Sequence, residues 1–501
     1  MKNSLIQIII PAIYVLMIIS KFSFCNNYLI LPFSIKNQIF QSNSNLIKAS
    51  DYLKYIKSNL ISTRIYSGTP PKELEVYLSM EIYEILIGKG FCLPNSNSQY
   101  SPFSSSSYEN SRMTYFAPII TNGSFISDSF MFYNDINYTK NISVNKLDFI
   151  YANASTDFFE LFDLDQNCGY IGLQLSSGSE YFESNSIIYE LRYANAIKKK
   201  KWALVFKENS NKINNNYDGA LIIGIEEDDY MDIFNMNNSS DYTSVYSLAY
   251  TMKQINWEIK FDEIYYEINN IKYSFNASLA GRFLIDYNYI ICNIDYFDCI
   301  KNNFFNKYIN EKICYIDKNE TLKKKKRTDI QIINTIICDK SRFKDMNKFP
   351  TLYFKHIDLN KTFEFSYKDL FQEIGNSLVF SIVLDENEKD RWTFGRMFLK
   401  KYQFVFDNDQ KLITYIQTIN INEGENRANS ITSNNEFTIT VLKILIIICL
   451  LGGFGLGLFF GKKIWDKNKK KRANELNDDY EYVENNKEKK DDKDVGLFED
   501  K

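Results

Sequence analysis

Short apolar runs dominate the chain between residues 26 and 437, and this pattern limits the fold more than any other feature. Ile, Val, Tyr and Phe cluster or alternate over a few positions and are then interrupted by Asn, Ser, Asp or Gly. Such runs are typical of β-strands. They occur at Leu74–Leu78, Phe125–Tyr133, Leu204–Phe206, Ala220–Ile225, Trp257–Phe261, Ile264–Ile268 and Gln403–Phe406. The main helical candidates are Ser186–Ile197 and Phe297–Asn310, so the sequence predicts an all-β fold.

Two apolar segments near the ends of the chain predict a membrane topology. Leu5–Ile19 has the length of a signal-peptide core and precedes a predicted cleavage after Cys25, although an uncleaved anchor is the alternative. Thr438–Gly461 is long enough to cross a bilayer. Lys462–Arg472 holds seven basic residues against one acidic residue, which predicts a cytoplasmic side. We therefore expect a single-pass type I protein of the secretory pathway, the endolysosomal membrane or the cell surface.

Composition excludes several functional classes. The 59 basic and 62 acidic residues give a net charge of −3, so no global field attracts nucleic acid. The single histidine, His356, excludes a multi-histidine metal site, and we expect it on the surface. Phosphate-binding, dinucleotide-binding, zinc-peptidase and hydrolase-elbow motifs are absent from the sequence. The sequence therefore predicts no metal and no cofactor.

A secretory compartment changes how the cysteines and asparagines are interpreted. Six cysteines lie between the predicted cleavage after Cys25 and the second apolar segment, and an even number in an oxidising compartment predicts up to three disulfides with fifteen connectivities. Nine glycosylation sequons lie in the same part of the chain, as expected for an extracytoplasmic domain. They begin at Asn122, Asn137, Asn141, Asn153, Asn237, Asn238, Asn276, Asn319 and Asn360.

Five ordered segments carry the most specific patterns in the chain. They are Ile65–Pro71, the residues Tyr115, Gly123 and Asp128, then Cys168–Leu173, Asp218–Ile225 and Trp392–Asp407. Their order and spacing resemble the pepsin-like aspartic peptidase family. The resemblance implies two β-rich lobes with a cleft between them for a peptide or protein ligand. It also implies that Tyr115 lies on a flap over that cleft, and Trp257 fits the strand that opens the second lobe.

The resemblance and the apolar segments together predict the domain organisation. A signal peptide covers residues 1–25, the N-terminal pepsin-like lobe 26–230 and the C-terminal lobe 231–420. A stalk covers 421–437, the transmembrane helix 438–461 and the cytoplasmic tail 462–501. In the tail, Tyr480 and Val483 have the spacing that vesicle-coat adaptors bind.

The family's catalytic chemistry is not preserved in the sequence. Aspartic peptidases use two carboxylates that share a proton, each in an Asp-Thr/Ser-Gly triplet, and neither triplet occurs here. Counting along the resemblance puts Ser79 in place of the first catalytic Asp and Asp286 in the second position. Glu81 lies two residues from the expected first position, so its use would require a shifted loop. Asp286 is followed by Tyr287 and Asn288, where the family has Thr or Ser and then Gly, and these larger residues would crowd the loop that Gly permits.

We therefore expect a non-catalytic protein that binds a peptide or protein, or serves at a surface, with Asp286 as a vestigial carboxylate. The alternative is a membrane-bound aspartic endopeptidase with an atypical site that uses Asp286. The resemblance also bears on the disulfides, because Cys338 matches a cysteine of the family and Cys314 substitutes for its missing partner. Cys292–Cys299 and Cys92–Cys168 are the remaining predicted pairs.

Overall fold

The computed structural model divides the chain into two compact units, Met1–Ile419 and Asn420–Lys501. In the second unit it describes only a short helix over 464–469. No helix in the described ranges is long and apolar enough to cross a membrane, and the predicted segment 438–461 lies outside them. The described residues are 28–35, 60–82, 84–89, 101–110, 123–133, 141–153, 169–175, 186–207, 216–234, 236, 238–248, 256–275, 279–322, 330–388, 390–418 and 464–469.

The first unit is built mainly of β-strands in three sheets, which confirms the predicted fold class at this level. The first sheet has 13 strands, and it contains strands from both the beginning and the end of the chain segment that forms this unit. The order is β11 (Tyr242–Tyr246), β26 (Leu412–Ile416), β25 (Gln403–Asp407), β9 (Lys201–Phe206), β10 (Gly219–Ile223), β1 (Leu29–Ile35), β2 (Ile61–Ser67), β3 (Lys72–Ser79), β8 (Gly169–Gly172), β4 (Ile85–Lys89), β7 (Asn141–Asn153), β6 (Gly123–Tyr133) and β5 (Glu109–Asn110).

The other two sheets come from the later part of the unit. The second sheet has nine strands: β12 (Glu258–Lys260), β15 (Ala280–Phe283), β24 (Trp392–Phe394), β16 (Ile290–Ile291), β23 (Ile382–Asp385), β18 (Ile330–Asp339), β22 (Ser377–Phe380) and β21 (Phe371–Ile374), with β17 (Cys314–Leu322) paired to β18. The third sheet has the order β14 (Ile271–Ser274), β13 (Glu263–Ile268), β19 (Leu352–His356) and β20 (Lys361–Phe365).

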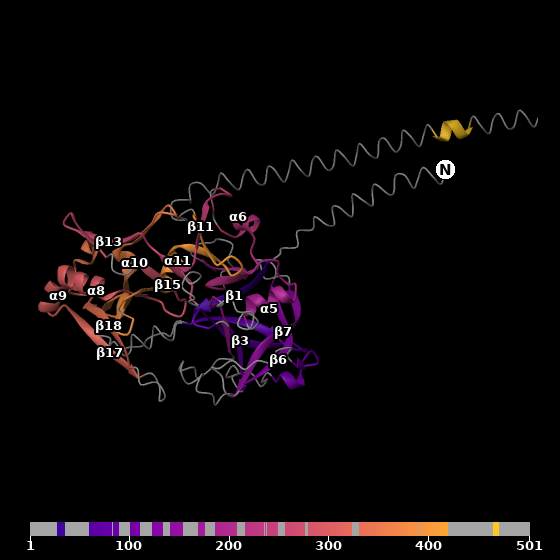
Figure 1. Cartoon of the computed structure of the whole chain (residues 1–501), viewed down its shortest axis with the longest axis horizontal. Helices are drawn as coiled ribbons and strands as arrows, with labels where there is room; N and C mark the ends of the chain where they lie inside the picture. Colours follow the sequence, from indigo (N-terminus) through magenta and orange to yellow (C-terminus); the bar gives the residue numbers. More distant parts are fainter. Residues whose placement is uncertain are drawn as a thin grey trace, which may run out of the picture. The chain divides into compact units, whose positions relative to one another are not determined.

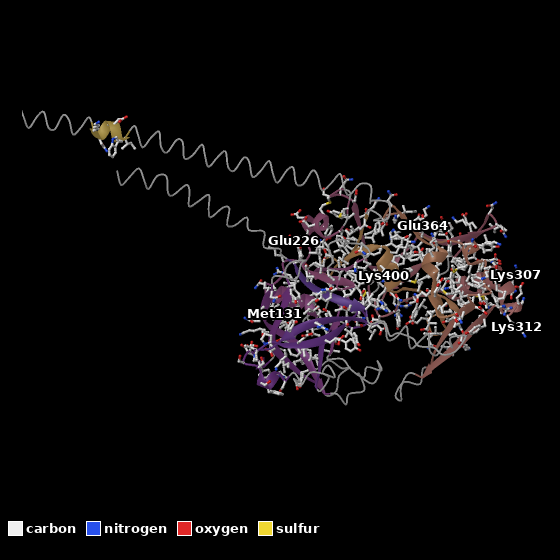
Figure 2. The ribbon with its side chains drawn as sticks, turned by 180° about the vertical axis from the view of Figure 1, so that it is seen from behind. Met131, Glu226, Lys307, Lys312, Glu364 and Lys400 are labelled. Atoms are coloured by element: carbon white, nitrogen blue, oxygen red, sulfur yellow. A yellow bond between two sulfur atoms is a disulfide. The ribbon has the colours of Figure 1, made fainter. Side chains whose placement is uncertain are left out.

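The strands form two groups, which we name the first lobe (β1–β10) and the second lobe (β12–β24). In Figure 1, β3, β6 and β7 lie together on one side of the unit, and β13, β17 and β18 lie on the other. Figure 2 shows the same separation from behind, with Met131 of β6 far from Lys307. The last strands, β25 and β26, leave the second lobe and join the first sheet beside β9.

Few helices accompany the sheets, and their ends follow local sequence signals. The hydroxyl of Ser186 accepts a hydrogen bond from Tyr189 N at 3.1 Å and caps the predicted first helix. The second helical region begins earlier than Phe297, because the side chain of Asn293 caps it. The helices are α5 (Ile187–Tyr193), α6 (Tyr230–Ile233), α8 (Ile294–Ile300), α9 (Asn306–Asn310), α10 (Tyr367–Leu370) and α11 (Arg396–Lys401), with short turns η1 (Pro102–Ser104), η3 (Glu227–Asp229) and η5 (Met346–Lys348) and the π-helical η4 (Lys301–Phe305).

Aromatic side chains join the lobes to the returning C-terminal strands. The ring of Phe406 on β25 stacks on Trp202 at 4.4 Å and packs against Trp257 at 5.1 Å between centroids. The indole of Trp257 also donates a hydrogen bond to the carbonyl of Leu173 at 3.0 Å. All three rings are buried, and large aromatic side chains contribute several kcal/mol each when they leave water. Aromatic residues make up 16% of the sequence, and in this part of the fold they pack the core.

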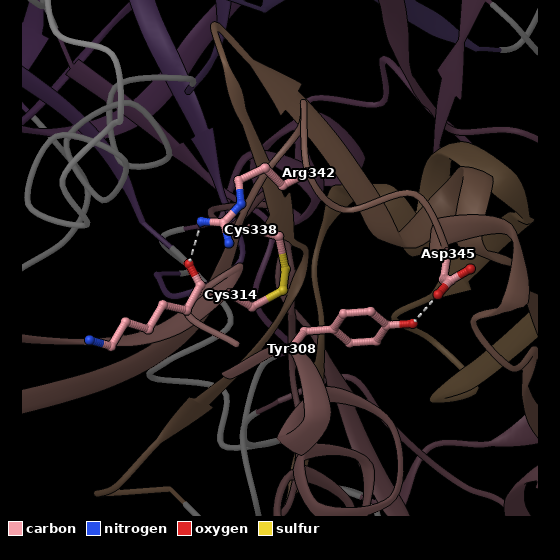
Figure 3. The surroundings of a disulfide bond; sticks show 6 residues. Tyr308, Cys314, Cys338, Arg342 and Asp345 are labelled. Carbon is pink, nitrogen blue, oxygen red and sulfur yellow. Dashed lines mark hydrogen bonds between the residues drawn. A yellow bond between two sulfur atoms is a disulfide. The ribbon is translucent and has the colours of Figure 1, made fainter. Parts of the chain in front are cut away.

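One disulfide joins β17 and β18 at the base of their hairpin. Cys314 and Cys338 face each other in the strand register and are bonded, as predicted. Figure 3 shows the bond between two hydrogen bonds that fix the surrounding chain. Arg342 donates to the carbonyl of Lys312 at 3.1 Å, and Tyr308 donates to Asp345 at 2.7 Å.

The predicted Cys292–Cys299 bond is not formed, because the two thiols occupy different environments. Cys292 is fully buried just before α8 begins. Cys299 lies near the end of α8, where its sulfur is 3.0 Å from the hydroxyl of Tyr266 and accepts a hydrogen bond from Asn303. Cys92 and Cys168, the third predicted pair, lie outside the described residues.

Two further groups of predicted residues can be placed. His356 was expected on the surface, but it is buried at the end of β19, and its Nδ1 accepts a hydrogen bond from Leu359 N at 3.3 Å. Burial lowers the pKa of His356, so this histidine is a neutral residue of the core. Among the sequons, Asn141, Asn238 and Asn360 are exposed. The side chains of Asn122, Asn137, Asn153, Asn237, Asn276 and Asn319 lie outside the described residues.

Candidate functional site

Each lobe contains the same arrangement of three strands, in which one central strand lies between two flanking strands. In the first lobe, β8 pairs with β3 in parallel and with β4 in antiparallel orientation. In the second lobe, β24 pairs with β15 in parallel and with β16 in antiparallel orientation. The outer strands continue the likeness, because β4 pairs in parallel with β7 and β16 pairs in parallel with β23. A loop between the two flanking strands therefore occupies the same place in each lobe.

Strand register shows which residues of the two loops correspond. In the first lobe, Ile171 of β8 lies opposite both Leu78 and Ile85. In the second lobe, Phe394 of β24 lies opposite both Phe283 and Ile290. The flanking pair is seven positions apart in both cases, so the loops have equal length.

The register therefore aligns Glu81 with Asp286. Glu81 is the third residue after Leu78, and Asp286 is the third residue after Phe283. Both carboxylate side chains are partly buried. Counting along the sequence pointed to Ser79 instead, because that count used the turn before β3 and took no account of pairing with β8. No spacing in the sequence alone identifies Glu81, because Leu78 and Ile85 are matched with Phe283 and Ile290 only through their pairing with Ile171 and Phe394.

The two loops, Ser79–Ile82 and Asp286–Tyr289, contact each other through their carboxylates. The Asp286 carboxylate accepts a hydrogen bond from the backbone N–H of Met80 at 3.0 Å and another from the hydroxyl of Ser79. In the opposite direction, the hydroxyl of Tyr287 donates to Glu81 Oε1 at 2.9 Å. The hydroxyl of Ser79 also accepts from Glu81 N at 3.1 Å. We refer to these two loops, joined by these contacts, as the loop pair.

Burial and charge act together on Asp286. Desolvation, followed by the nearby negative charge of Glu81, raises the pKa of Asp286 from 3.8 to about 7. The hydrogen bonds from Ser79 and Met80 oppose this increase but do not cancel it. Burial also raises the pKa of Tyr287 well above its ordinary value, so the phenol stays a hydrogen-bond donor. At mildly acidic pH the loop pair can thus hold one protonated carboxyl group.

Close backbone contact fixes the second loop. Gly395 follows β24, and its N–H donates to the carbonyl of Tyr289 at 3.1 Å. A Cβ atom at this position would lie 2.2 Å from that carbonyl and 2.5 Å from the carbonyl of Tyr287. Only glycine therefore permits the chain after β24 to approach the loop. In the first lobe, a Cβ atom on Gly169 would lie 1.9 Å from the carbonyl of Leu86.

The structure describes Asp128 of the expected flap pattern but not Tyr115. Tyr115 lies outside the described residues. Asp128, on β6, is fully buried and accepts hydrogen bonds from Ser105 Oγ at 3.0 Å and Ser129 N at 2.8 Å. Ser105 Oγ in turn accepts from Thr69 N at 2.8 Å. Asp128 therefore secures the turn before β3, which is a structural role.

No cluster of three metal-ligating side chains occurs within the ranges that the structure describes. The loop pair supplies two carboxylates, one hydroxyl and one phenol. Groups of this kind can hold a peptide by hydrogen bonds or move a proton, depending on whether the carboxylates face a ligand or each other.

Comparisons with known proteins add little to this geometry. No family model matches the sequence. No curated protein matches it either. Among solved structures, the crystal structure of basic 7S globulin from soybean is similar at 12% identity and a TM-score of 0.48, over 78% of this chain and 97% of that chain.

Proposed function

We propose that residues 26–437 form a pepsin-like, peptide- or protein-binding ectodomain that does not cleave its ligand. One observation carries this proposal: donors of the protein already hold both carboxylates of the loop pair. Asp286 accepts from Ser79 and Met80, and Glu81 accepts from Tyr287. A carboxylate pair that hydrolyses peptides binds and activates a water molecule between its two members, and here the hydroxyl of Tyr287 already occupies one oxygen of Glu81.

The residues around the carboxylates support the same conclusion. In the family that the sequence resembles, glycine follows each catalytic Asp-Thr/Ser and leaves room for the loops to meet. Here Tyr287 and Asn288 stand at the Thr/Ser and Gly positions, and the hydroxyl of Tyr287 donates a hydrogen bond to Glu81. The hydroxyl of Tyr287 would compete with a water or a substrate carbonyl for Glu81 Oε1.

A specific observation also favours the second candidate, an acid endopeptidase. Strand register aligns Glu81 with Asp286, so each lobe contributes one carboxylate from the same position. The pKa of Asp286, raised to about 7, would keep one carboxyl group protonated in an acidic compartment while the other acts as a base. This assignment uses Glu81 rather than Ser79 as the partner of Asp286.

Incubation of the purified full-length chain in detergent with a broad peptide library, between pH 4 and pH 7, separates the two candidates. We expect peptide binding that survives in Asp286→Asn and Glu81→Gln, with no cleavage in any of the three proteins. Cleavage that both substitutions abolish would establish the endopeptidase. A tyrosine substitution elsewhere, Tyr353→Phe, serves as the control for handling and contaminating peptidases.

Membrane anchoring and glycosylation are part of the same proposal. Residues 1–25 and 438–461 would act as signal and anchor, and Tyr480 and Val483 would bind a vesicle-coat adaptor. Three sequon asparagines, at 141, 238 and 360, are exposed and therefore accessible to glycans. Protease protection of the tail and glycosidase sensitivity of residues 26–437 in isolated membranes test the topology. Glycans on the tail side would contradict it.

A further inference from the structure

The outward face of the third sheet carries a pair of stacked tyrosines. Tyr265 on β13 and Tyr353 on β19 lie opposite each other in the strand register, and their rings stack at 4.9 Å between centroids with 18° between the ring planes. Both side chains are partly exposed, so they lie outside the buried core. Two rings stacked in this way leave one further ring face at each end of the stack.

The protein covers one end of this stack with a cation of its own. The Nζ atom of Lys272, on β14, lies 3.8 Å from the centroid of the Tyr265 ring, where the ring quadrupole attracts it. The same ammonium group pairs with Glu263 at 2.7 Å, and Glu263 also accepts a hydrogen bond from Ser274 at 3.0 Å. This end of the stack therefore combines a ring, a carboxylate and a cation.

The other end has the ring and the carboxylate without the cation. Glu364 on β20 lies opposite Tyr353 in the register, so the two side chains are neighbours on the same face (Figure 2 labels Glu364). The hydroxyl of Tyr402 donates to the carbonyl of Glu364 at 2.9 Å and fixes its backbone. Among the residues that the structure describes, no second ring and no cation contacts Tyr353, and the exposed carboxylate of Glu364 has no hydrogen-bond or ion-pair partner.

The described charges of this face leave one carboxylate in excess. Strand alternation places three glutamates and two lysines on the outward side, namely Glu263, Glu267, Glu364, Lys272 and Lys355. Lys272 pairs with Glu263, and Lys355 lies opposite Glu263 in the register. Both lysines thus lie beside Glu263, and the face keeps a negative charge at Glu364, next to the second ring of the stack.

We propose that Tyr353 and Glu364 bind the guanidinium group of an arginine from a partner protein. A guanidinium is planar, so it can lie parallel to a tyrosine ring while the N–H groups at its edge donate to a carboxylate. The ammonium group of a lysine can approach the ring but cannot stack on it, and an anion would meet the Glu364 carboxylate. The two side chains lie on a sheet face, which suits a side chain that another protein presents, whereas small molecules bind mainly in concave pockets.

Titration of the full-length chain in detergent with three matched peptides tests the site. The peptides are acetylated and amidated Gly-Gly-X-Gly-Gly, in which X is arginine, lysine or citrulline, the neutral counterpart of arginine. Ligand-observed NMR gives the dissociation constants. We expect the arginine peptide to bind most tightly, the lysine peptide to bind several-fold more weakly, and the citrulline peptide not to bind at the same concentrations. Added salt should weaken the arginine peptide, because the charges are exposed.

Substitutions on the same face locate the binding. Glu364→Gln removes the charge and should weaken the arginine peptide about fivefold. Tyr353→Leu removes the ring and should weaken it about threefold. Glu267→Gln makes the same charge change opposite Lys272 and is the matched control, so its binding should stay unchanged. The thermal unfolding temperature of each variant shows that it is folded.

Four results would overturn the proposal. The first is equal binding of the arginine and citrulline peptides, and the second is a lysine peptide that binds as tightly as the arginine peptide. The third is no binding of the arginine peptide at millimolar concentration. The fourth is unchanged binding by the folded Glu364→Gln and Tyr353→Leu variants, or an equal loss in Glu267→Gln.

Discussion

The loops that follow β3 and β15 have the same register and length, yet their carboxylates are in different surroundings. Asp286, in the second lobe, accepts from a backbone N–H and a hydroxyl of the first lobe. Glu81, in the first lobe, accepts from a tyrosine of the second. The two halves therefore share a backbone plan but are not interchangeable in chemistry.

In both lobes the backbone sets the position of the carboxylate, whereas the surrounding side chains set its proton affinity. Burial is the largest cause of the raised pKa of Asp286, and the second is the negative charge of Glu81, the equivalent carboxylate of the other lobe. The lobes are thus linked electrostatically at the point where they are most alike. Each of the following changes alters one side of this comparison.

The largest effect is expected for Gly395→Ala, which would force the second loop away from β24. The added methyl group would lie 2.2 Å from the carbonyl of Tyr289, so the backbone of the second loop or of residue 395 must shift. We expect a loss of more than about 3 kcal/mol in the free energy of unfolding, measured with denaturant. We expect Gly169→Ala, in the first lobe, to lower the free energy of unfolding by a similar amount.

Gly375→Ala is the control for backbone strain alone. Its Cβ would meet no atom within 4 Å, and only the positive φ of 58° opposes the substitution. A cost of about 1 kcal/mol is expected. If Gly395→Ala were no worse than Gly375→Ala, the second loop would not depend on close contact with β24.

Asp286→Asn should flatten the dependence of stability on pH. The folded protein holds the Asp286 proton up to about pH 7 and the unfolded chain releases it near 3.8, so the folded state binds more protons between these values. Stability therefore falls as the pH rises through this window, by at most roughly 4 kcal/mol from this group. Thermal unfolding at pH 4 to 8 should show a smaller decrease in the variant.

The matched control for this experiment is Asp345→Asn, which changes a carboxylate whose pKa is lowered by Lys348 and Tyr308. That variant should leave the decrease between pH 4 and pH 7 in place. An unchanged pH profile in Asp286→Asn would contradict the raised pKa.

Glu81→Gln tests the electrostatic link between the lobes. Removal of the negative charge should lower the pKa of Asp286 by about one pH unit and leave it above 3.8, because desolvation is the larger cause. Carboxyl-carbon NMR of Asp286 measures the titration directly. An Asp286 pKa that does not move would mean that the two carboxylates are too far apart to act as a pair.

The smallest effect is expected for Tyr287→Phe, which removes the hydrogen bond to Glu81 and keeps the ring. A net cost of about 1 kcal/mol in the free energy of unfolding is expected. Tyr353→Phe, where the ring stacks on Tyr265, should change little. A gain of peptide cleavage in Tyr287→Phe would indicate that this tyrosine blocks a competent carboxylate pair.

Much of the secondary structure could be predicted because its signals are local. The runs at Leu74–Leu78 and Gln403–Phe406 became β3 and β25, and Ser186 caps α5. The prediction that His356 lies on the surface was wrong, and the sequence could not show this, because burial of His356 depends on packing around β19. The Cys314–Cys338 pair followed from the resemblance, whereas the separation of Cys292 from Cys299 depended on the start of α8.

The β-rich character, the lack of both Asp-Thr/Ser-Gly triplets and the position of Asp286 follow from the amino-acid sequence, because they depend on local patterns. The correspondence of Glu81 with Asp286 depends on how the strands pair in three dimensions. The reason is that register between β3 and β8, and between β15 and β24, is set by hydrogen bonds between segments about 90 or more residues apart. A count along one segment cannot detect such pairing, and a shift of two residues keeps every side chain on the same face of the sheet.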